Sequence, residues 1–483
     1  MIKRLLIFPS WSAIIVLGLV IRLYTAHQTI DILHADQHFQ TLEPAAHLVF
    51  GWGWMSWEWQ AGLRSWFVPG LYAMILWPCK ILGLTSGPLL LQICRAATAL
   101  LSTAAIWGFA RLLLQRGISI LAGWVALALF AFTPVFIRYA PATLSDTLAM
   151  DFLWLAMPLI FWTINQEKKL FWWLAGFALG WTFLTRVQML FWAVALLATA
   201  VVLLPRARKH LHWAAFGYCV PVLFQGALDW ATWGRPFNSL IVNVQKNWVE
   251  NVASFYGVSP WYEYFKGVPA DWDTGFTALF VLSLVILFIR FQKALRREDG
   301  LIFIPAIFFV GMHCLVPHKE MRFLLPLYPV AIYSIALAIQ AVLPARLLKF
   351  NFQPWMLAAM IPVLGGLAWM SAPIATDPKY YPMSNMSELP VEIWKEGKLQ
   401  PNDCVLIVGQ YWIWTHGELL QGKPYRYVES RLNDLSDDSL RNCVYAIVLP
   451  QWESYFAARA RAVAPSWHPV KQSYWGYLLY SKS

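Results

Sequence analysis

Long apolar runs alternate with short polar turns along most of the chain. A helix of about 20 apolar residues spans a bilayer, and runs near that length recur. The pattern predicts spanning helices at 11–30, 92–114, 118–137, 145–164, 170–185, 187–204, 210–230, 275–291, 300–317, 322–343 and 354–371. A further apolar stretch, 67–90, is interrupted by Pro69, Pro78, Gly83, Gly87 and Pro88. We therefore expect a polytopic α-helical membrane protein with about 11 transmembrane helices.

Basic clusters in the turns decide the orientation, because cytoplasmic loops carry an excess of Lys and Arg. If 67–90 enters the membrane without crossing it, and Lys3 and Arg4 stay in the cytoplasm, every basic cluster lies inside. These clusters are Arg111 and Arg116; Lys168 and Lys169; Arg206, Arg208 and Lys209; Arg290, Lys293, Arg296 and Arg297; Arg346 and Lys349. If 67–90 crosses once, the clusters lie outside. We prefer the first topology, with the N-terminus inside and the C-terminus outside.

The composition agrees with a membrane protein. Of the 483 residues, 59% are hydrophobic and only 13% are charged, whereas soluble domains carry about 25% charged residues. The 29 Trp suit interfacial belts. The net charge of +11 comes from the turn clusters, and no nucleic-acid module, P-loop or dinucleotide motif is present. We expect membrane lipid, and no nucleic acid, among the partners.

The last part of the chain has ordinary polarity. Strand-like runs at Cys404–Gly409, Val444–Leu449 and Tyr477–Tyr480, with a helical stretch at Glu453–Val463, predict a small C-terminal α/β domain. We expect a transmembrane catalytic domain over 1–371 and an extracytoplasmic or lumenal domain over 372–483. Cys404 and Cys443 either form a disulfide there or remain two separately buried thiols.

The first outer loop, residues 31–66, is too polar for lipid and rich in aromatic residues. Its residues 37–48 have helical spacing and predict interfacial amphipathic helices. Asp36 follows the first span, where a carboxylate can act as a base on an acceptor hydroxyl. The competing interpretation is a helix N-cap, for which Asp is a preferred residue. Glu43 and Glu58 are weaker candidates, expected to be solvated.

A charged turn, PHKEMRF at 317–323, separates two apolar spans on the outer side. Cationic groups at a membrane boundary suit a phosphate, which accepts charge-assisted hydrogen bonds. Snorkelling to lipid phosphates explains the charges equally well. The candidates are His318, Lys319 and Arg322, with Glu320 as a supporting residue.

Two further polar patches lie at span ends. One contains Arg138, Ser145 and Asp146, and the other is Arg186, which either holds a phosphate, pairs with an acid or occupies an outer turn. The ten His residues form no HExxH or similar metal-ligand pattern. The sequence therefore predicts no metal site.

Three segments resemble glycosyltransferase family 22 of the GT-C class, which includes mannosyltransferases of GPI-anchor and N-glycan-precursor synthesis. The turn HKEMRF, His318 to Phe323, looks like the family's HKExRF signature. The first loop, HADQHFQTLEPAAHLVFGWGWMSWEW, and the segment Asp229 to Phe265, with YG-x-x-PW at Tyr256 to Trp261, lie in the family's order. The resemblance covers roughly 31–330.

The resemblance implies a GT-C fold and an inverting transfer of mannose from a polyprenyl-phosphate-mannose donor, without a metal or other cofactor. The acceptor would be a hydroxyl of a glycan or glycolipid, and the product an α-mannoside. It implies that Asp36 is the catalytic acid–base residue and that His318, Lys319 and Arg322 line the donor phosphate. The family usually has Asp-Glu where this chain has Asp36-Gln37, so Gln37 is kept as a supporting residue.

Three alternatives remain at this point. A related GT-C transferase could use another polyprenyl-phosphate sugar, the chain could transport a lipid-linked sugar, or it could be a catalytically silent member of the fold. The expected location is either a bacterial inner membrane with the site facing the periplasm or an ER membrane with the site facing the lumen.

Overall fold

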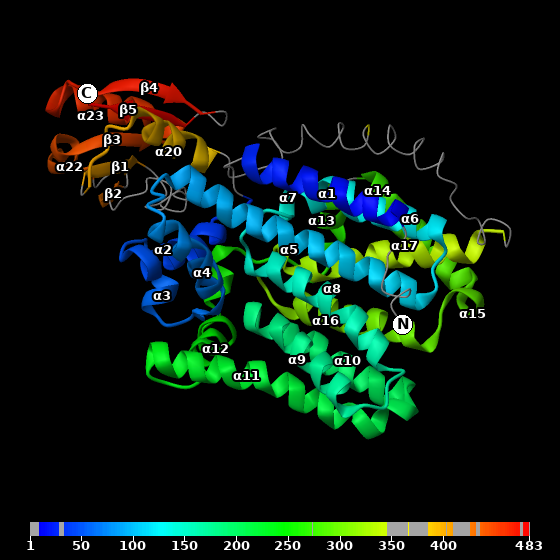
Figure 1. Cartoon of the computed structure of the whole chain (residues 1–483). Coiled ribbons are helices and arrows are strands. Elements are labelled where there is room, and N and C mark those ends of the chain that lie inside the picture. Colours follow the sequence, from blue (N-terminus) through cyan, green and yellow to red (C-terminus); the bar gives the residue numbers. More distant parts are fainter. Residues whose placement is uncertain are drawn as a thin grey trace. The chain divides into compact units, whose positions relative to one another are not determined.

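The computed structural model describes residues 9–28, 33–272, 274–344, 366, 385–401, 403–408, 426–430, 435–473 and 477–482. The chain divides into two compact units (Figure 1). The helical unit comprises Met1–Thr25, Glu58–Val68 and Ala97–Ala375. The mixed unit comprises Ala26–Trp57, Pro69–Ala96 and Thr376–Ser483. Each unit is described below by itself.

Apolar helices build most of the helical unit, and they are connected by short turns. The longer ones are α1 (Pro9–Gln28), α5 (Gly87–Arg116), α6 (Ile120–Phe132), α8 (Ser145–Thr163), α9 (Lys169–Thr185), α10 (Met189–Leu203), α11 (Leu211–Trp233), α14 (Thr274–Ile289), α16 (Gly300–Leu315) and α17 (Tyr328–Val342). Helices α1 and α5 begin or end in the mixed unit.

Short elements join these helices. They are α3 (Trp57–Gln60), α7 (Pro134–Tyr139), η3 (Pro205–His210), α12 (Asn238–Val244), η4 (Gln245–Val249), η5 (Val252–Tyr256), α13 (Glu263–Trp272), α15 (Phe291–Ala294), η6 (Arg297–Asp299) and η7 (Met321–Leu327).

The predicted spans up to residue 343 coincide in position with these helices, and the number of about 11 crossings stays a prediction. Within the described residues, five helical segments are long and apolar enough to cross a membrane, and four shorter apolar helices accompany them. The expected span 118–137 is divided into α6 and α7. Thr133 has extended backbone, and Pro134 begins a new helix after it. The apolar stretch 67–90, which proline and glycine residues interrupt, contains helix α4 (Phe67–Ile81) and the start of α5. Helix α5 begins at Gly87, whereas the expected span began at residue 92. Expected span 354–371 lies outside the described residues, apart from residue 366.

Small residues allow two of the helices to approach closely. A Cβ on Gly176 of α9 would meet the Ala214 carbonyl oxygen of α11 at 1.8 Å. On the facing helix, a Cβ on Gly217 would meet the Trp173 carbonyl oxygen at 2.0 Å. Because lipid provides no hydrophobic drive between helices, such close backbone packing is what holds membrane helices together.

The mixed unit combines first-loop helices with a small sheet. Its helices are η2 (Gln37–Leu42), α2 (Glu43–Phe50), most of α4, α20 (Asn385–Glu396), α22 (Asp437–Asn442), η12 (Pro450–Trp452) and α23 (Glu453–Val463). The strands are β1 (Cys404–Val408), β2 (Arg426–Ser430), β3 (Cys443–Val448), β4 (His468–Gln472) and β5 (Leu478–Ser481). In the described residues they form one five-stranded sheet of order β2-β1-β3-β5-β4. Strand β1 is parallel to β2 and β3, whereas β5 is antiparallel to β3 and β4.

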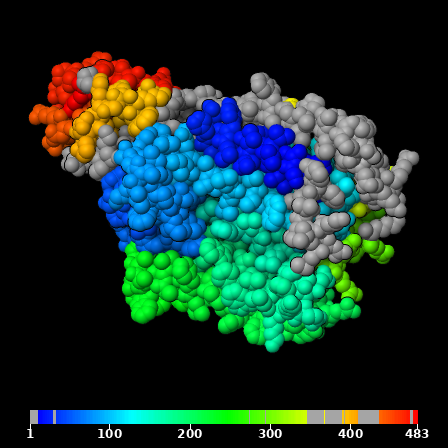
Figure 2. All heavy atoms as spheres, viewed as in Figure 1, coloured from blue at the N-terminus to red at the C-terminus, as the bar shows by residue number. Residues whose placement is uncertain are grey.

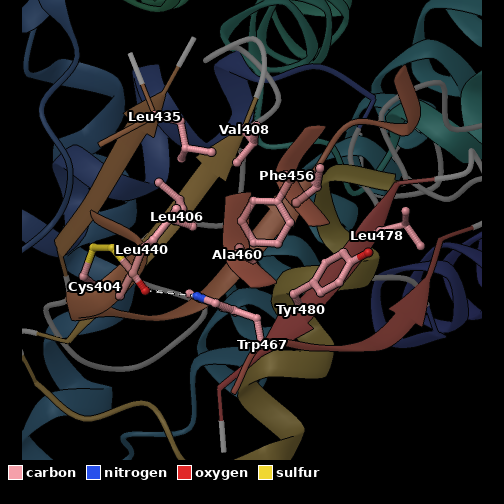
Figure 3. Packing of buried hydrophobic residues seen from close by; sticks show 13 residues of the cluster. Cys404, Leu406, Val408, Leu435, Leu440, Phe456, Ala460, Trp467, Leu478 and Tyr480 are labelled. Carbon is pink, nitrogen blue, oxygen red and sulfur yellow. Dashed lines mark hydrogen bonds between the residues drawn. A yellow bond between two sulfur atoms is a disulfide. The ribbon is translucent and has the colours of Figure 1, made fainter. Parts of the chain in front are cut away.

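Side chains of β1 alternate between the two faces of the sheet, as a strand requires. Leu406 and Val408 pack in one cluster with Phe456 and Trp467, and the Trp467 indole donates to the Leu440 carbonyl at 3.0 Å (Figure 3). Val405 and Ile407 belong to a second cluster with Leu389 and Ile393 of α20. A disulfide joins Cys404 to Cys443, so the first of the two open alternatives for these cysteines is the one observed.

Candidate functional site

The signature turn, residues 317–323, connects α16 to α17 in the helical unit. Helix α16 ends before Pro317, which has no backbone N–H to donate. The residue before a proline is restricted to extended backbone, and Val316 has φ −78° and ψ 131°. Glu320 is also extended, with φ −132° and ψ 138°, and η7 follows it. The turn thereby brings four charged or titratable side chains to one end of two helices: His318, Lys319, Glu320 and Arg322.

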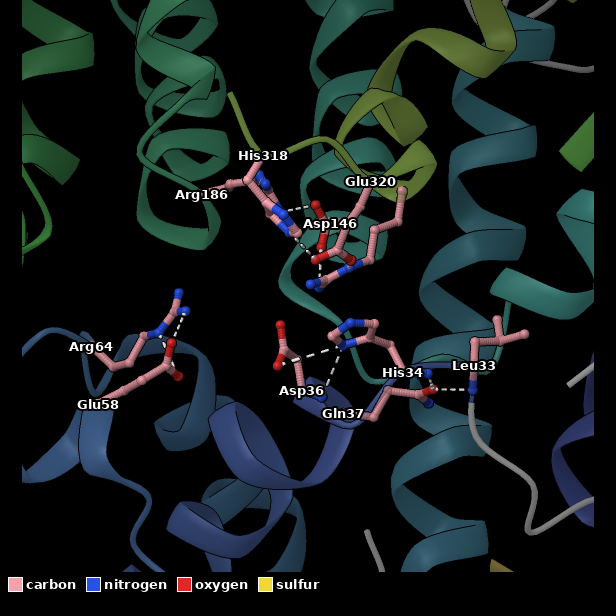
Figure 4. A network of polar contacts seen from close by, with 11 residues as sticks. Leu33, His34, Asp36, Gln37, Glu58, Arg64, Asp146, Arg186, His318 and Glu320 are labelled. Carbon is pink, nitrogen blue, oxygen red and sulfur yellow. Dashed lines mark hydrogen bonds and ion pairs between the residues drawn. The ribbon is translucent and has the colours of Figure 1, made fainter. Parts of the chain in front are cut away.

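A buried ion-pair network surrounds Asp146, which lies in the first turn of α8 and has no exposed surface. Its Oδ2 accepts a hydrogen bond from Nη1 of Arg322 at 3.2 Å, and its Oδ1 contacts Nη1 of Arg186. Glu320 supplies a second carboxylate, whose Oε2 accepts from Nε of Arg322 at 2.5 Å. Figure 4 labels Asp146, Arg186 and Glu320 of this network. Arg186 therefore pairs with an acid, which is one of the alternatives that its sequence position left open.

Both arginines also lie near the aromatic ring of the signature turn. The guanidinium carbons of Arg186 and Arg322 are 4.7 Å and 5.1 Å from the ring centroid of Phe323. A cation at this distance is attracted by the negative face of the ring. Asp146 and Phe323 thus hold two guanidinium groups together, although like charges repel.

Arg138 and Asp146, which the sequence placed in one polar patch, have different partners in the structure. Whereas Asp146 contacts the two arginines, Nη2 of Arg138 donates to the Asp271 carbonyl at 3.0 Å and lies 3.5 Å from its Oδ1. Asp271, at the end of α13, also accepts a hydrogen bond from the Tyr328 hydroxyl. Burial raises the pKa of Asp271 above its ordinary value, although Tyr328 and Arg138 act against this. These contacts connect α7, α13 and α17 beside the signature turn.

The segment with the sequence YGVSPW, Tyr256 to Trp261, lies directly against the signature turn. The Ser259 N–H donates to the Pro317 carbonyl at 3.0 Å. The Lys319 ammonium donates to the carbonyls of Ser259 at 3.0 Å and Val316 at 2.6 Å. Because an ammonium has three N–H donors, these two bonds leave one for a ligand. Two of the three segments that carried the family resemblance therefore form one structural unit.

The contacts of His318 indicate that its imidazole is doubly protonated. Nδ1 lies 3.1 Å from the Gly257 carbonyl oxygen, and Nε2 lies 2.9 Å from Oε1 of Glu320. A carbonyl and a carboxylate only accept hydrogen bonds, and a neutral imidazole has a single N–H to donate. Both bonds form only with an imidazolium. The hydrogen bond to Glu320 accordingly raises the pKa of His318, against the effect of burial. Since two arginines face two carboxylates, His318 and Lys319 provide the excess positive charge.

In the mixed unit, Asp36 precedes η2. It has helical backbone angles, φ −61° and ψ −20°, and its side chain makes no capping hydrogen bond. The N-cap interpretation is therefore wrong, because a capping residue has extended backbone and accepts from the helix. The Asp36 N–H donates to Nδ1 of His34 at 3.2 Å. That nitrogen carries no proton, so its 3.5 Å distance to the Asp36 carboxylate is not an ion pair.

The two weaker acidic candidates have structural partners. Glu43 is fully buried, and its Oε2 accepts the Trp54 N–H at 2.9 Å. The carboxylate of Glu58 accepts from Arg64 at 2.5 Å and 3.1 Å, and its side chain is only 15% exposed. The expectation that both are solvated is wrong, because a buried carboxylate needs hydrogen bonds to replace its water.

Sequence reasoning assigned no role to Asp271, Tyr328, Gly257 or Ser259. Asp271 had a usable signal, since Arg138 at a membrane boundary requires a nearby acid. Gly257 and Ser259 act through backbone groups, which side-chain chemistry does not reveal. In the ranges that the structure describes, no three His, Cys, Asp or Glu residues gather as a metal site would need.

Comparison with known proteins places the chain in a family. The model of the Alg9-like mannosyltransferase family matches residues 13–390. The chain belongs to this family. GPI mannosyltransferase 3 of Candida albicans is 27% identical over 322 residues, which cover 66% of this chain and 62% of that protein. Human GPI alpha-1,2-mannosyltransferase 3 is 26% identical over 300 residues, covering 61% and 51%. The chain thus spans less than two thirds of the length of these relatives.

A solved structure shares the fold of this family member. ArnT from Cupriavidus metallidurans, in its complex with undecaprenyl phosphate, matches with a TM-score of 0.63 over 98% of each chain, at 11% identity. The same enzyme in the apo state matches with a TM-score of 0.62. At this identity the likeness concerns the fold alone. It confirms the predicted GT-C architecture of a multi-pass membrane protein, and the family match confirms the resemblance seen in the signature turn.

Proposed function

We propose that the chain is an inverting mannosyltransferase that uses a polyprenyl-phosphate-mannose donor. The acceptor is a hydroxyl group of a glycan or glycolipid, and the product is an α-mannoside. The reaction takes place at the outer face of the membrane, which is the periplasmic face in a bacterium or the lumenal face in the ER.

The buried pair of arginines at the signature turn carries this proposal. Arg186 and Arg322 come from different elements and are held together by Asp146 and Phe323. A guanidinium presents a planar set of donors that fits phosphate oxygens. A membrane-bound enzyme whose donor has a phosphate at headgroup depth needs such groups at the end of its spans. The complex of ArnT with undecaprenyl phosphate supports a donor of this chemical class.

The sugar and the acceptor are inferred from the relatives. The Candida albicans and human relatives are GPI mannosyltransferases, and the human protein is an alpha-1,2-mannosyltransferase. Their names support mannose as the transferred sugar. They also make a mannose-terminated glycolipid of the GPI type the first acceptor to test.

The proposed reaction is a single displacement. Asp36 accepts the proton of the acceptor hydroxyl, and that oxygen forms a bond to the anomeric carbon from the face opposite the phosphate. The bond from the anomeric carbon to the phosphate oxygen breaks, and polyprenyl phosphate leaves with the bonding electrons. The cations of the signature turn stabilise the negative charge that develops on this leaving group.

The test is a transfer assay with purified protein, radiolabelled polyprenyl-phosphate-mannose and mannose-terminated glycolipids, with and without EDTA. We expect labelled product from wild type and none from Asp36→Asn. Asp438→Asn, the same change at an exposed residue of the C-terminal domain, should be as active as wild type. An Asp36→Asn enzyme with near-normal turnover would exclude Asp36 as the base.

The same assay separates the alternatives. Product formed only with another polyprenyl-phosphate sugar would identify a different donor. Movement of labelled donor across the membrane of a proteoliposome, with no new covalent product, would identify a transporter. Absence of transfer, donor hydrolysis and transport would identify a catalytically silent family member.

A further inference from the structure

Large apolar side chains are exposed along one loop of the helical unit. The loop runs between α11 and α14, and we call residues 244–265 the aromatic loop. Phe255 is 78% exposed, Val249 76% and Trp261 64%. The other exposed large apolar residues of this loop are Val244, Trp248, Tyr256, Val258, Tyr262 and Phe265. Soluble proteins rarely leave so many contiguous apolar side chains in water, and such patches mark a binding surface.

The neighbouring helices indicate what covers this patch. The loop follows α11, where Leu223 is 64% and Trp230 65% exposed, and it precedes α14, where Leu282 is 54% exposed. In a multi-pass membrane protein these apolar helix surfaces face lipid. The end of α11 and the segment after it (green) lie open at the surface in the space-filling view (Figure 2). The exposed apolar surface therefore continues from the lipid-facing helices into the loop.

The chemistry of the loop suits the boundary between acyl chains and headgroups. Aromatic rings with a polar edge, such as Trp261 and Tyr262, settle at that depth. Lysine side chains extend from it towards lipid phosphates, and Lys246 and Lys266 flank the exposed rings. The Lys266 ammonium lies 4.5 Å from the ring centroid of Tyr262, so cation and ring are presented together.

We propose that the aromatic loop lies in the headgroup layer of the outer leaflet, with its exposed rings directed into the bilayer. Its other edge holds the signature turn through the Gly257 carbonyl and both backbone groups of Ser259. The bilayer thus restrains the aromatic loop, and the loop holds the signature turn in place. Resting on the proposed function, this arrangement sets His318 and Lys319 level with the phosphate of a lipid-linked donor.

The test measures depth directly and does not depend on activity. Cys219 and Cys314 are replaced by Ser, and single cysteines are introduced at Phe255 and Trp261 for spin labelling in phosphatidylcholine–phosphatidylglycerol nanodiscs. Collision with oxygen, which concentrates in lipid, is compared with collision with a water-soluble nickel chelate. Leu282→Cys serves as the lipid control and Asp438→Cys as the water control. Val258→Cys is a third loop site should one variant fail to fold.

We expect the labels at 255 and 261 to collide more with oxygen than with the nickel chelate, as at 282 and opposite to 438. Labels that collide with the nickel chelate as often as at 438 would overturn the proposal. Water-exposed labels that become immobile only when a mannose-terminated glycolipid is added would also overturn it, and would assign the loop to acceptor binding. Since no transfer is measured, a wrong donor or a silent enzyme leaves the result unchanged.

Discussion

The side-chain oxygen of Gln37 accepts the backbone N–H of Leu33 at 2.7 Å and a second N–H, from His34, at 3.3 Å (Figure 4). These bonds close the turn that comes immediately before Asp36. An amide oxygen accepts hydrogen bonds as a carboxylate does. The replacement of the family's usual Glu by Gln therefore retains the turn, and it removes a second negative charge beside the proposed base.

Gln37→Leu is expected to lower the turnover of mannose transfer by about 100-fold, because a displacement of about 1 Å at a reacting group costs that much. Gln37→Glu restores the acceptor and should remain within about threefold of wild type in turnover. Turnover is measured beside the unfolding temperature, so that lost folding is recognised. A fully active Gln37→Leu enzyme would show that the turn does not position Asp36.

Mannose transfer should decline on the alkaline side because His318 is an imidazolium. Folding raises the pKa of His318 above its ordinary value of about 6.5. The contribution of its two hydrogen bonds to the stability of the folded protein is therefore fully present below that ordinary pKa. It is lost as the pH rises through the raised pKa, when one of the bonds to Gly257 and Glu320 must break.

The pH profile of kcat/KM checks this prediction. The His318→Gln variant has no group that titrates here, so its alkaline decline should disappear, with lower activity throughout the pH range. Glu320→Gln removes the strongest cause of the raised pKa and should move the decline to lower pH. An unchanged profile in both variants would mean that His318 does not titrate in the active range.

Removal of the Asp146 carboxylate should destabilise the helical unit. Breaking a buried ion pair from one side costs about 3–5 kcal/mol, because a buried charge is left without its partner. Asp146→Asn leaves Arg186 in this condition and leaves Arg322 with the carboxylate of Glu320 alone, and donor affinity should fall together with stability. The matched control is Asp437→Asn, which breaks an exposed pair with Arg459 and should cost under about 1 kcal/mol. Thermal unfolding in detergent distinguishes them, and equal shifts would refute the prediction.

The sequence predicted the bounds of individual helices and strands more successfully than the side-chain contacts between them. Helix α23 has the bounds expected from its pattern, Glu453–Val463, because spacing along one helix is a local property. The contact of Asp146 with Arg322 joins residues 176 positions apart, and no local spacing encodes it. Burial of Glu43 was missed for the same reason, since its partner Trp54 belongs to a different turn of the loop. Strand β4 escaped prediction because its burial does not alternate.

The disulfide gives a test of which side of the membrane the C-terminal domain occupies. Disulfides persist in the periplasm or ER lumen and are rare in the cytosol. Alkylation of protein denatured directly in the alkylating reagent should label four of the six cysteines, and reduction should add Cys404 and Cys443. Six labelled cysteines before reduction would place the domain in the cytoplasm. Because the two cysteines are 39 positions apart in the sequence, their replacement by Ala should cost the domain about 4 kcal/mol.

Phe39 connects the Asp36 helix to the C-terminal domain. It packs on the cluster of Leu389, Ile393 and Val405, and its ring centroid lies 4.7 Å from that of Trp54. The domain therefore supports the helix that begins one residue after the proposed base. Phe39→Ala should cost about 1–3 kcal/mol, since a half-buried ring loses part of its burial energy, and turnover should fall with an unchanged KM for the donor.

Hydrogen exchange measures whether the contact of Phe39 with the C-terminal domain stabilises η2. In Phe39→Ala we expect faster exchange in both η2 and α20, whereas Phe39→Leu, which retains an apolar contact, should stay close to wild type. Trp467→Phe serves as a control within the opposite cluster of the sheet, since it should loosen the C-terminal core without affecting η2. Faster exchange in η2 alone would mean that the first-loop helix folds independently of the domain. Turnover would then be lost through local disorder around Asp36 rather than through the removal of support from the sheet.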